Sequence, residues 1–303
     1  MKLFNYDIEI ISAPSILGLK PTGVEDLGKS LLASGLAENL KSTHPVIHVP
    51  TLNQLYKEKR DKDTNCLNTI AIRDFSLALS NTISATIDRD RFAFVLGGDC
   101  SILTGIMPAL KAKGNYGLIF LDAHADFYQA DKSVTGEVAD MDLAIVTGRG
   151  PDLLTNINDL QPYVKDKNVI HIGQRDWEET KKYGSQDIRQ TDIKCINLAD
   201  IESKGIHTVV AEVIEYSNTI EVEGFWIHFD TDVLSDEINP AVDYRLPGGL
   251  QFRQAEHLIK SLLMTGKIAG ITVTIFNPRL DRDGHISKNI TTSLGRAFEN
   301  NAN

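Results

Sequence analysis

The chain alternates between short apolar runs and longer amphipathic stretches. Apolar runs of strand length occur at 6–12, 46–49, 92–96, 117–122, 168–173, 194–197, 225–230 and 269–275. Most of these runs are continuous rather than alternating, which is typical of strands that are buried on both faces of a parallel sheet. The pattern therefore predicts about eight strands, most of them parallel.

Amphipathic stretches separate many of the runs and predict helices at 24–40, 71–88, 102–113, 208–216 and 252–265. In the second of these, Ile72, Phe75, Leu79 and Ile83 share one face. The polar, glycine-containing stretch 129–159 predicts loops, with one helix around 141–146. Strands that alternate with helices indicate an α/β fold.

No internal repeat or linker divides the chain, and acidic motifs are spread from Asp99 to Asp232. One domain spanning residues 1–303 is therefore expected, because only a single fold would bring these motifs together. With 42% hydrophobic and 24% charged residues, the composition is that of an ordinary globular protein. The chain contains no apolar run of about 18 residues, the length that predicts a membrane span.

Charge and cysteine content narrow the expected partners. A net charge of −10 argues against binding to nucleic acid or to an anionic membrane surface, since both need clustered Lys and Arg. Three scattered cysteines do not form a disulfide framework and suit a reducing compartment. The first ten residues include acids where a signal peptide needs an unbroken apolar region, so we expect a cytoplasmic protein.

Three of the predicted strands run directly into acidic or sulfur-bearing residues. The run 92–96 is followed by Gly-Gly-Asp-Cys-Ser, which contains Cys100, and the run 117–121 by Asp122, His124 and Asp126. The run 225–229 is followed by Asp230 and Asp232. Open α/β sheets place their ligands at the carboxyl ends of their strands. Residues at alternate positions of an extended chain point the same way, so we expect these side chains to converge.

The converging groups are typical of a metal site. Four carboxylates near a core would repel one another and cost several kcal/mol unless they are compensated. Two divalent ions roughly 3.5–4 Å apart would balance them and activate a shared water, so the residues predict a binuclear metal hydrolase. The competing interpretation is an acidic loop cluster that is satisfied by caps and by Lys or Arg pairs.

Several nearby residues have a structural interpretation beside a functional one. Cys100 is either a metal ligand or a small buried hydrophobe. Asp99 is expected to cap the helix that starts near Ser101 rather than to bind metal. His171 and His228 lie inside apolar runs. A histidine in such a run is expected to be a core residue, or to orient a metal ligand, more often than to bind the metal itself.

The three motifs, in this order, resemble the signature motifs of the arginase and agmatinase family of ureohydrolases, and the segments 13–24 and 247–250 are also similar to that family. The resemblance implies a three-layer α/β/α sandwich around an eight-stranded, mostly parallel sheet. It also implies two divalent metal ions, usually Mn²⁺, and hydrolysis of a C–N bond in a linear amidine. A small cationic substrate and a homo-oligomer, trimeric or hexameric, are further implications.

The resemblance assigns roles to residues by motif. One ion would be bound by Cys100, Asp122, Asp126 and Asp230, and the other by Asp122, His124, Asp230 and Asp232. Asp126 would also hydrogen-bond a bridging hydroxide that attacks the guanidinium-type carbon. Glu178 lies in a segment similar to the family's loop for the substrate amine, beside Arg175 and Asp176.

The sequence also departs from the family. The family's first motif ends in His, and Cys100 stands there; a thiolate is softer and favours Zn²⁺ or Fe²⁺. Ala139 occupies the position of a proton-shuttling histidine, and Ile275 that of a glutamate that binds the guanidinium group. We predict that Glu137, or Asp140 and Asp142, replaces the missing acid or shuttle.

These departures leave the substrate open. A hydroxyguanidino compound is one alternative, because cysteine at the position of Cys100 also occurs in family members that act on such substrates. A different amide-type bond is a second alternative. A catalytically silent family member that binds a ligand is the third.

Overall fold

The computed structural model describes residues 6–51 and 55–299, and within them one eight-stranded sheet has every strand pair parallel. The first five residues, on which the signal-peptide expectation partly rests, lie outside this description. The strand order is β2-β1-β3-β8-β7-β4-β5-β6. The strands are β1 Ile8–Ser12, β2 Ile47–His48, β3 Phe92–Leu96, β4 Tyr116–Leu121, β5 Val169–Ile172, β6 Lys194–Ile196, β7 Gly224–Asp230 and β8 Ile268–Thr274. Each coincides with a predicted apolar run to within two residues.

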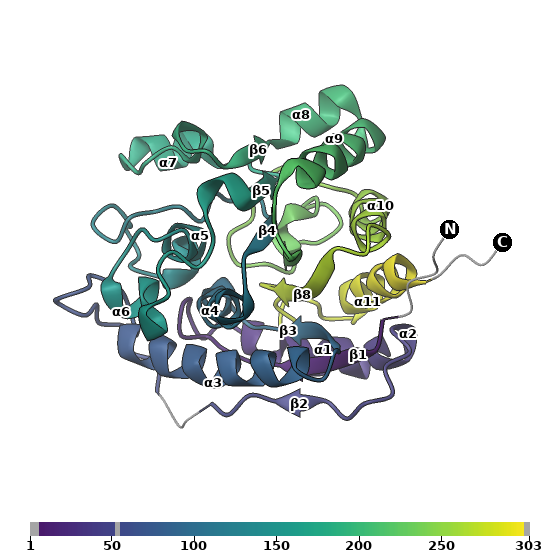
Figure 1. Ribbon diagram of the computed structural model, residues 1–303, viewed down its shortest axis with the longest axis horizontal. Coiled ribbons are helices and arrows are strands. Elements are labelled where there is room, and N and C mark those ends of the chain that lie inside the picture. Colours follow the sequence, from purple (N-terminus) through teal and green to yellow (C-terminus); the bar gives the residue numbers. More distant parts are fainter. Residues whose placement is uncertain (1–5, 52–54, 300–303) are drawn as a thin grey trace.

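Helices cover both faces of the sheet, and Figure 1 shows α4 and α5 on one side with α9, α10 and α11 on the other. The helices are α1 Leu27–Ala33, α2 Leu36–Asn39, α3 Thr69–Ile87, α4 Leu103–Lys113, α5 Asp142–Val146, α6 Asp152–Thr155, α7 Trp177–Lys182, α8 Leu198–Lys204, α9 Ile206–Thr219, α10 Phe252–Leu263 and α11 His285–Phe298. The predicted three-layer α/β/α sandwich is confirmed, and its sheet is wholly rather than mostly parallel.

Alternation along the central strands divides the core between the two faces. In β4, Ile119 and Leu121 pack in the cluster that includes α8 to α11, whereas Leu118 and Phe120 pack in the cluster that includes α3 to α6. Burial on both faces is the reason why these strands appear as continuous apolar runs.

The predicted helices are confirmed for α3, α4, α5, α9 and α10, but the single helix expected at 24–40 is wrong. It breaks into α1 and α2 at Gly35, whose φ of +88° ends the helical path. The helices α6, α7, α8 and α11 were not predicted. In α11 the apolar positions Ile290 and Leu294 are buried at helical spacing among Ser and Thr residues, a signal that the polar composition obscured.

The strand order brings the motif-bearing strands together. The strands β3, β8, β7 and β4 are neighbours at the centre of the sheet, and because all are parallel their carboxyl ends lie at one edge. Within the described residues, no helix is long and apolar enough to cross a membrane.

Candidate metal centre

Two overlapping groups of potential metal ligands lie where β3, β4 and β7 end. Donor atoms of Cys100, Asp122, His228 and Asp230 all lie within 4.8 Å of one another, and so do those of Asp122, His124 and Asp126. Asp122 belongs to both groups. The three strand ends therefore converge on one site, as the sequence predicted, with the addition of His228.

Turns rather than an extended chain bring the ligands together. The strand β4 ends at Leu121, and Asp126 has a φ of +44°, which is left-handed backbone. The Asp122 carboxylate accepts a hydrogen bond from the backbone N–H of His124 at 2.6 Å, and that of Asp230 accepts one from Asp232 at 2.8 Å. The expectation of simple alternation along extended chain is therefore wrong beyond Leu121, because these local hydrogen bonds turn the chain.

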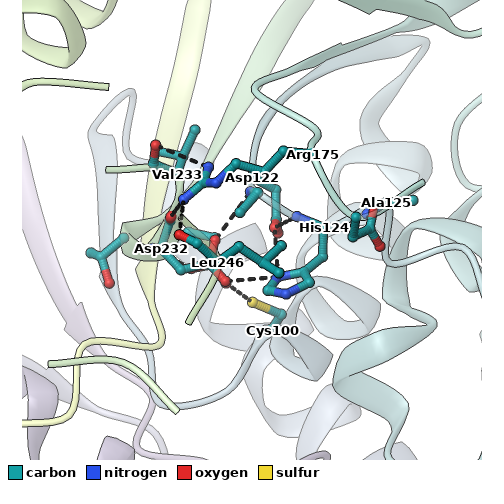
Figure 2. A network of polar contacts seen from close by, with 12 residues as sticks. Cys100, Asp122, His124, Ala125, Arg175, Asp232, Val233 and Leu246 are labelled. Carbon is teal, nitrogen blue, oxygen red and sulfur yellow. Dashed lines mark hydrogen bonds and ion pairs between the residues drawn. The ribbon is translucent and has the colours of Figure 1, made fainter. Parts of the chain in front are cut away.

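The side chains already contact one another across the site. The Cys100 thiol donates a hydrogen bond to Asp230 Oδ2 at 2.8 Å, and His124 Nδ1 lies 2.9 Å from Asp232 Oδ2. Figure 2 shows Cys100 and His124 pointing into this cluster beside Asp122 and Asp232. The carboxylate oxygen Oδ2 of Asp122 is buried and has no hydrogen-bond partner in the described structure. The cluster thus presents a free buried acceptor, the kind of atom that a cation would satisfy.

Burial and mutual repulsion disfavour ionised carboxyl groups here. Burial, with the Asp232 charge, raises the pKa of Asp122 to about 7. The pKa values of Asp126 and Asp230 also lie well above their usual range, because both groups are buried among other carboxylates. Asp232 is the exception: burial opposes its ionisation, but His124 beside it holds its pKa below the usual value. His124 thus balances Asp232, and ionisation of the other carboxyl groups needs a further cation.

The thiol of Cys100 follows the same rule. Burial, followed by the charges of Asp230, Asp142, Asp126 and Asp122, raises the pKa of the thiol well above its usual range. A cation would have to bind before this group became a thiolate, which is the form that ligates metals.

Arg175 does not supply that cation. Its guanidinium group donates to the backbone carbonyls of Asp232 at 2.7 Å, Leu234 at 3.2 Å and Leu246 at 3.4 Å. Within the described residues, Arg175 forms no ion pair with a carboxylate of the cluster. The side chain instead fixes the segment after β7, as the dashed lines of Figure 2 show.

Asp99 has the capping role that was expected. Its Oδ1 accepts from the backbone N–H of Ser101 at 2.9 Å, and its Oδ2 from the Ser15 hydroxyl at 3.0 Å and the Gly18 N–H at 3.2 Å. These bonds join the loop after β1 to the start of the helix after β3. They thereby hold the backbone that carries Cys100.

A cavity of about 370 Å³ opens above the cluster. Most of its polar lining is acidic: Asp126, Glu137, Asp140, Asp176, Glu179, Asp230, Asp232 and Asp243. The lining also includes the cation Arg245 and the apolar side chains of Leu19, Val134, Ala139, Leu246 and Ile275. Such a cavity favours a small ligand with positive charge and an apolar stem.

The chain is similar to known proteins over most of its length. A model of the arginase family matches residues 34–298. This chain belongs to the arginase family. An arginase from Staphylococcus aureus (strain MSSA476) is 31% identical over 304 residues, which cover 96% of each chain. The arginase from Bacillus caldovelox is 30% identical over 300 residues, covering 96% of this chain and 97% of the relative.

Solved structures of the family show the same architecture. The native structure of the Bacillus caldovelox arginase at pH 5.6 matches with a TM-score of 0.88 and 27% identity, over 98% of this chain and 100% of that chain. Proclavaminate amidino hydrolase from Streptomyces clavuligerus matches with a TM-score of 0.67 at 17% identity, over 97% of this chain and 90% of that one, and shows the fold alone. The arginase family comprises hydrolases that act on C–N bonds in amidines with binuclear divalent metal centres.

The two residues that depart from the family pattern lie at the cavity wall. Ala139 and Ile275 pack with Cys100 in one apolar cluster, and both line the cavity. Ile275 has a φ of +71°, a left-handed conformation that β-branched residues rarely adopt. This arginase-family chain therefore has an apolar wall where the family resemblance implies a histidine and a glutamate.

Glu137 lies at the same wall, held by residues that sequence reasoning missed. Its side chain is buried, its Oε2 accepts from the Tyr244 hydroxyl at 2.8 Å, and its Oε1 lies 3.4 Å from Lys20 Nζ. Nothing in the sequence pairs Glu137 with Tyr244, because 107 positions separate them.

Of the acids in the segment that resembles the family's loop for the substrate amine, only some line the cavity. Glu178 is on α7 with an exposed side chain and is not part of the cavity lining, whereas its neighbours Asp176 and Glu179 are. Successive side chains of an α-helix are rotated by about 100° about its axis. Glu178 and Glu179 therefore point in different directions, and only Glu179 reaches the cavity.

Proposed function

We propose that this chain is a binuclear metal-dependent hydrolase that cleaves a C–N bond of a linear amidine or guanidino-type small molecule. The observation that carries the proposal is the pair of donor clusters that share Asp122 at the floor of an acidic cavity. The unpartnered buried oxygen of Asp122 and the mixture of thiol, imidazole and carboxylates fit divalent ions.

We assign the ligands as follows. Cys100, Asp122, Asp126 and Asp230 would hold one ion, and Asp122, His124, Asp230 and Asp232 the other. The family resemblance favours Mn²⁺, whereas the soft thiolate of Cys100 favours Zn²⁺ or Fe²⁺. Two divalent ions bound by these residues would supply Lewis acidity and lower the pKa of a bound water molecule.

Acidic side chains of the protein would transfer protons during the reaction. Asp126 would hydrogen-bond the attacking water and accept its proton, because its carboxyl group lines the cavity and lies among the potential metal ligands. Glu137 would pass a proton to the leaving amine, since Tyr244 and Lys20 hold it at the wall.

Asp176 and Glu179 would bind a distal amine of the substrate, because both line the cavity. The resemblance assigns Glu178 to the same loop, and its contact with the substrate amine stays a prediction. The acidic lining supports a small cationic substrate.

A hydroxyguanidino compound is the second candidate, and the wall formed by Ala139 and Ile275 beside Cys100 favours it. A hydroxyguanidine is a weaker base than a guanidine, so it can enter a site that lacks the guanidinium-binding carboxylate at less electrostatic cost.

The test is metal content and turnover in the same preparation. We expect about two ions per chain after reconstitution with manganese or zinc, and hydrolysis of at least one compound in a panel of arginine, agmatine, hydroxyarginine and formiminoglutamate. Asp232→Asn should abolish turnover, and Asp131→Asn at an exposed position should not. Fewer than one bound ion together with no turnover would contradict the proposal and favour a silent family member.

The proton role of Glu137 has its own test. Glu137→Gln keeps the shape and the hydrogen bond from Tyr244 but cannot carry the proton, so we expect turnover to fall about 100-fold or more. Asp140→Asn and Asp142→Asn are the parallel variants, because these acids are the alternatives for the same role. Unaltered turnover in all three variants would contradict the replacement of the missing shuttle by this segment.

We further propose a cytoplasmic homo-oligomer, a trimer or a hexamer, as the family resemblance implies. The three free cysteines support a reducing compartment. Light scattering of the metal-loaded protein tests the oligomeric state, and a monomer would contradict it.

A further inference from the structure

Two buried histidines flank one phenylalanine directly beneath the carboxylates. In the sheet register His171 of β5 pairs with Phe120 of β4, and Phe120 pairs with His228 of β7. The ring centroids of His171 and His228 lie 5.2 and 4.7 Å from that of Phe120. Both histidines are 0% exposed. The two histidines lie at the same level of the sheet, but their ring nitrogen atoms contact different groups.

His171 has a structural partner. Its Nε2 lies 2.8 Å from the backbone carbonyl of His124, a normal hydrogen-bond distance. This contact supports the loop that carries His124, and His171 belongs to neither group of potential ligands.

His228 has no comparable partner in the described part of the chain. Its Nδ1 is buried without a hydrogen bond, and its Nε2 is 3.4 Å from the Thr274 hydroxyl, which in turn is 3.2 Å from the thiol of Cys100. An unsatisfied buried polar atom costs about 1–3 kcal/mol, which an apolar side chain in this layer would avoid. His171 Nδ1 is likewise buried without a hydrogen bond, so what distinguishes His228 is its distance from the potential metal ligands.

The position of His228 brings it close to those ligands. It is two residues before Asp230 on β7, so both side chains project from the same face of the sheet. One of its donor nitrogens lies within 4.8 Å of the donor atoms of Cys100, Asp122 and Asp230. Two ligands bound about 2.0–2.3 Å from the same ion are separated by no more than about 4.6 Å, so a small rotation of the ring suffices.

We propose that His228 is a metal ligand that shares an ion with Cys100. Cys100 stands where the family motif has histidine, and His228 would supply an imidazole to the same ion from the strand β7 beneath the site. The inference rests on the proposed two-metal centre. One sulfur, one nitrogen and carboxylate oxygens form a donor set that suits zinc better than manganese. A neutral imidazole adds a strong donor without adding to the negative charge of the four aspartates.

The experiment uses the full chain, stripped of metal and loaded with one equivalent of zinc, and X-ray absorption at the zinc edge. Sulfur should direct the first ion to the Cys100 site. We expect one sulfur and one imidazole per zinc in the unaltered protein. In His228→Asn the sulfur should remain and the imidazole disappear, and zinc affinity measured by chelator competition should fall at least about tenfold. His171→Asn is the matched control, equally buried in the same layer, and should keep both scatterers.

The spectrum of the unaltered protein decides the matter even if a variant fails to fold. Sulfur without imidazole would overturn the role of His228 and leave the two-metal proposal standing. A weaker affinity in His228→Asn with the imidazole still present would also overturn it, because His228 would then act only by positioning Cys100. No bound zinc at all would overturn both this inference and the proposed function.

Discussion

Cys100 is the residue that most changes the chemistry of this arginase-family site. Its thiol already bonds Asp230, and its ionisation depends on a cation, because burial holds its pKa well above the usual range. Thiolate and imidazole differ in softness, so the residue at this position selects among divalent ions.

Cys100→His should therefore raise the affinity for manganese by about tenfold, or roughly 1.4 kcal/mol. The imidazole is a harder ligand than the thiolate and needs no deprotonation at neutral pH. A manganese titration of the metal-free proteins provides the measurement. Cys195→Ser, at a half-buried cysteine outside the ligand groups, is the control and should leave the affinity unchanged. Equal manganese affinities for Cys100→His and the unaltered protein would contradict the role of Cys100 as a ligand.

Asp140 makes the stability of the metal-free protein depend on pH. Burial raises its pKa to about 7, although the hydroxyls of Thr135 and Ser133 donate to the carboxyl group and partly oppose the rise. The folded state therefore holds a proton on Asp140 between about pH 4 and 7, where the unfolded state has released it. Stability must fall as the pH rises through this window and level off above pH 7.

The rise from 3.8 to about 7 corresponds at most to about 4 kcal/mol, at about 1.4 kcal/mol per pH unit. Asp140→Asn cannot titrate, so it should lose less stability between pH 5 and 8 than the unaltered protein. Denaturant unfolding of the metal-free proteins at both pH values measures this difference. Asp131→Asn, with a side chain 70% exposed, should behave like the unaltered protein. Parallel pH profiles for Asp140→Asn and the unaltered protein would show that Asp140 is not the responsible group.

Among the elements, the junction between β3 and the helix after it places Asp99 and Cys100. The chain passes so close to the loop after β1 that a Cβ on Gly98 would lie 1.8 Å from the backbone carbonyl oxygen of Ser15. Backbone cannot yield as a flexible side chain can, so only glycine fits this junction.

Gly98→Ala should cost about 3 kcal/mol or more in unfolding free energy and weaken metal binding, because the junction must move. Gly184→Asn is the control: a Cβ there meets nothing within 4 Å, and asparagine tolerates the φ of +70°. Thermal unfolding and a zinc titration of both variants would test the prediction. A Gly98→Ala protein with unchanged stability and affinity would contradict it.

In the whole molecule, the metal centre ties together segments that are far apart in the chain. Its potential ligands come from residue 100, residues 122–126 and residues 228–232, on strands that are neighbours only in the folded sheet. Ligands assembled by folding do not exist in the unfolded chain, so metal binding stabilises the fold.

Metal at 100 times its dissociation constant should stabilise the protein by about 2.7 kcal/mol, which for a chain of 303 residues raises the melting temperature by roughly 4 °C. Scanning calorimetry of the metal-free and zinc-loaded proteins measures this change. Asp122→Asn removes a group common to both ligand clusters and should lose most of the increase. An equal rise in that variant would place the stabilising metal elsewhere.

The sequence by itself determined the strands, most of the long helices and the motifs that follow β3, β4 and β7. It could do so because apolar runs and amphipathic periods are local properties, and because parallel strands that are buried on both faces leave a continuous signal. The sequence did not predict the break at Gly35 or the helix α11. Their local patterns are weak or mixed, so tertiary packing decides the structure there.

Only the tertiary structure decided which residues share the site. The strand order placed β3, β8, β7 and β4 side by side, and the register put His228 in the layer beneath Asp230. The face of α7 turned Glu179 rather than Glu178 into the cavity lining, and folding brought Tyr244 to Glu137. Proximity between distant positions depends on how whole elements pack, and no local pattern in the chain encodes it.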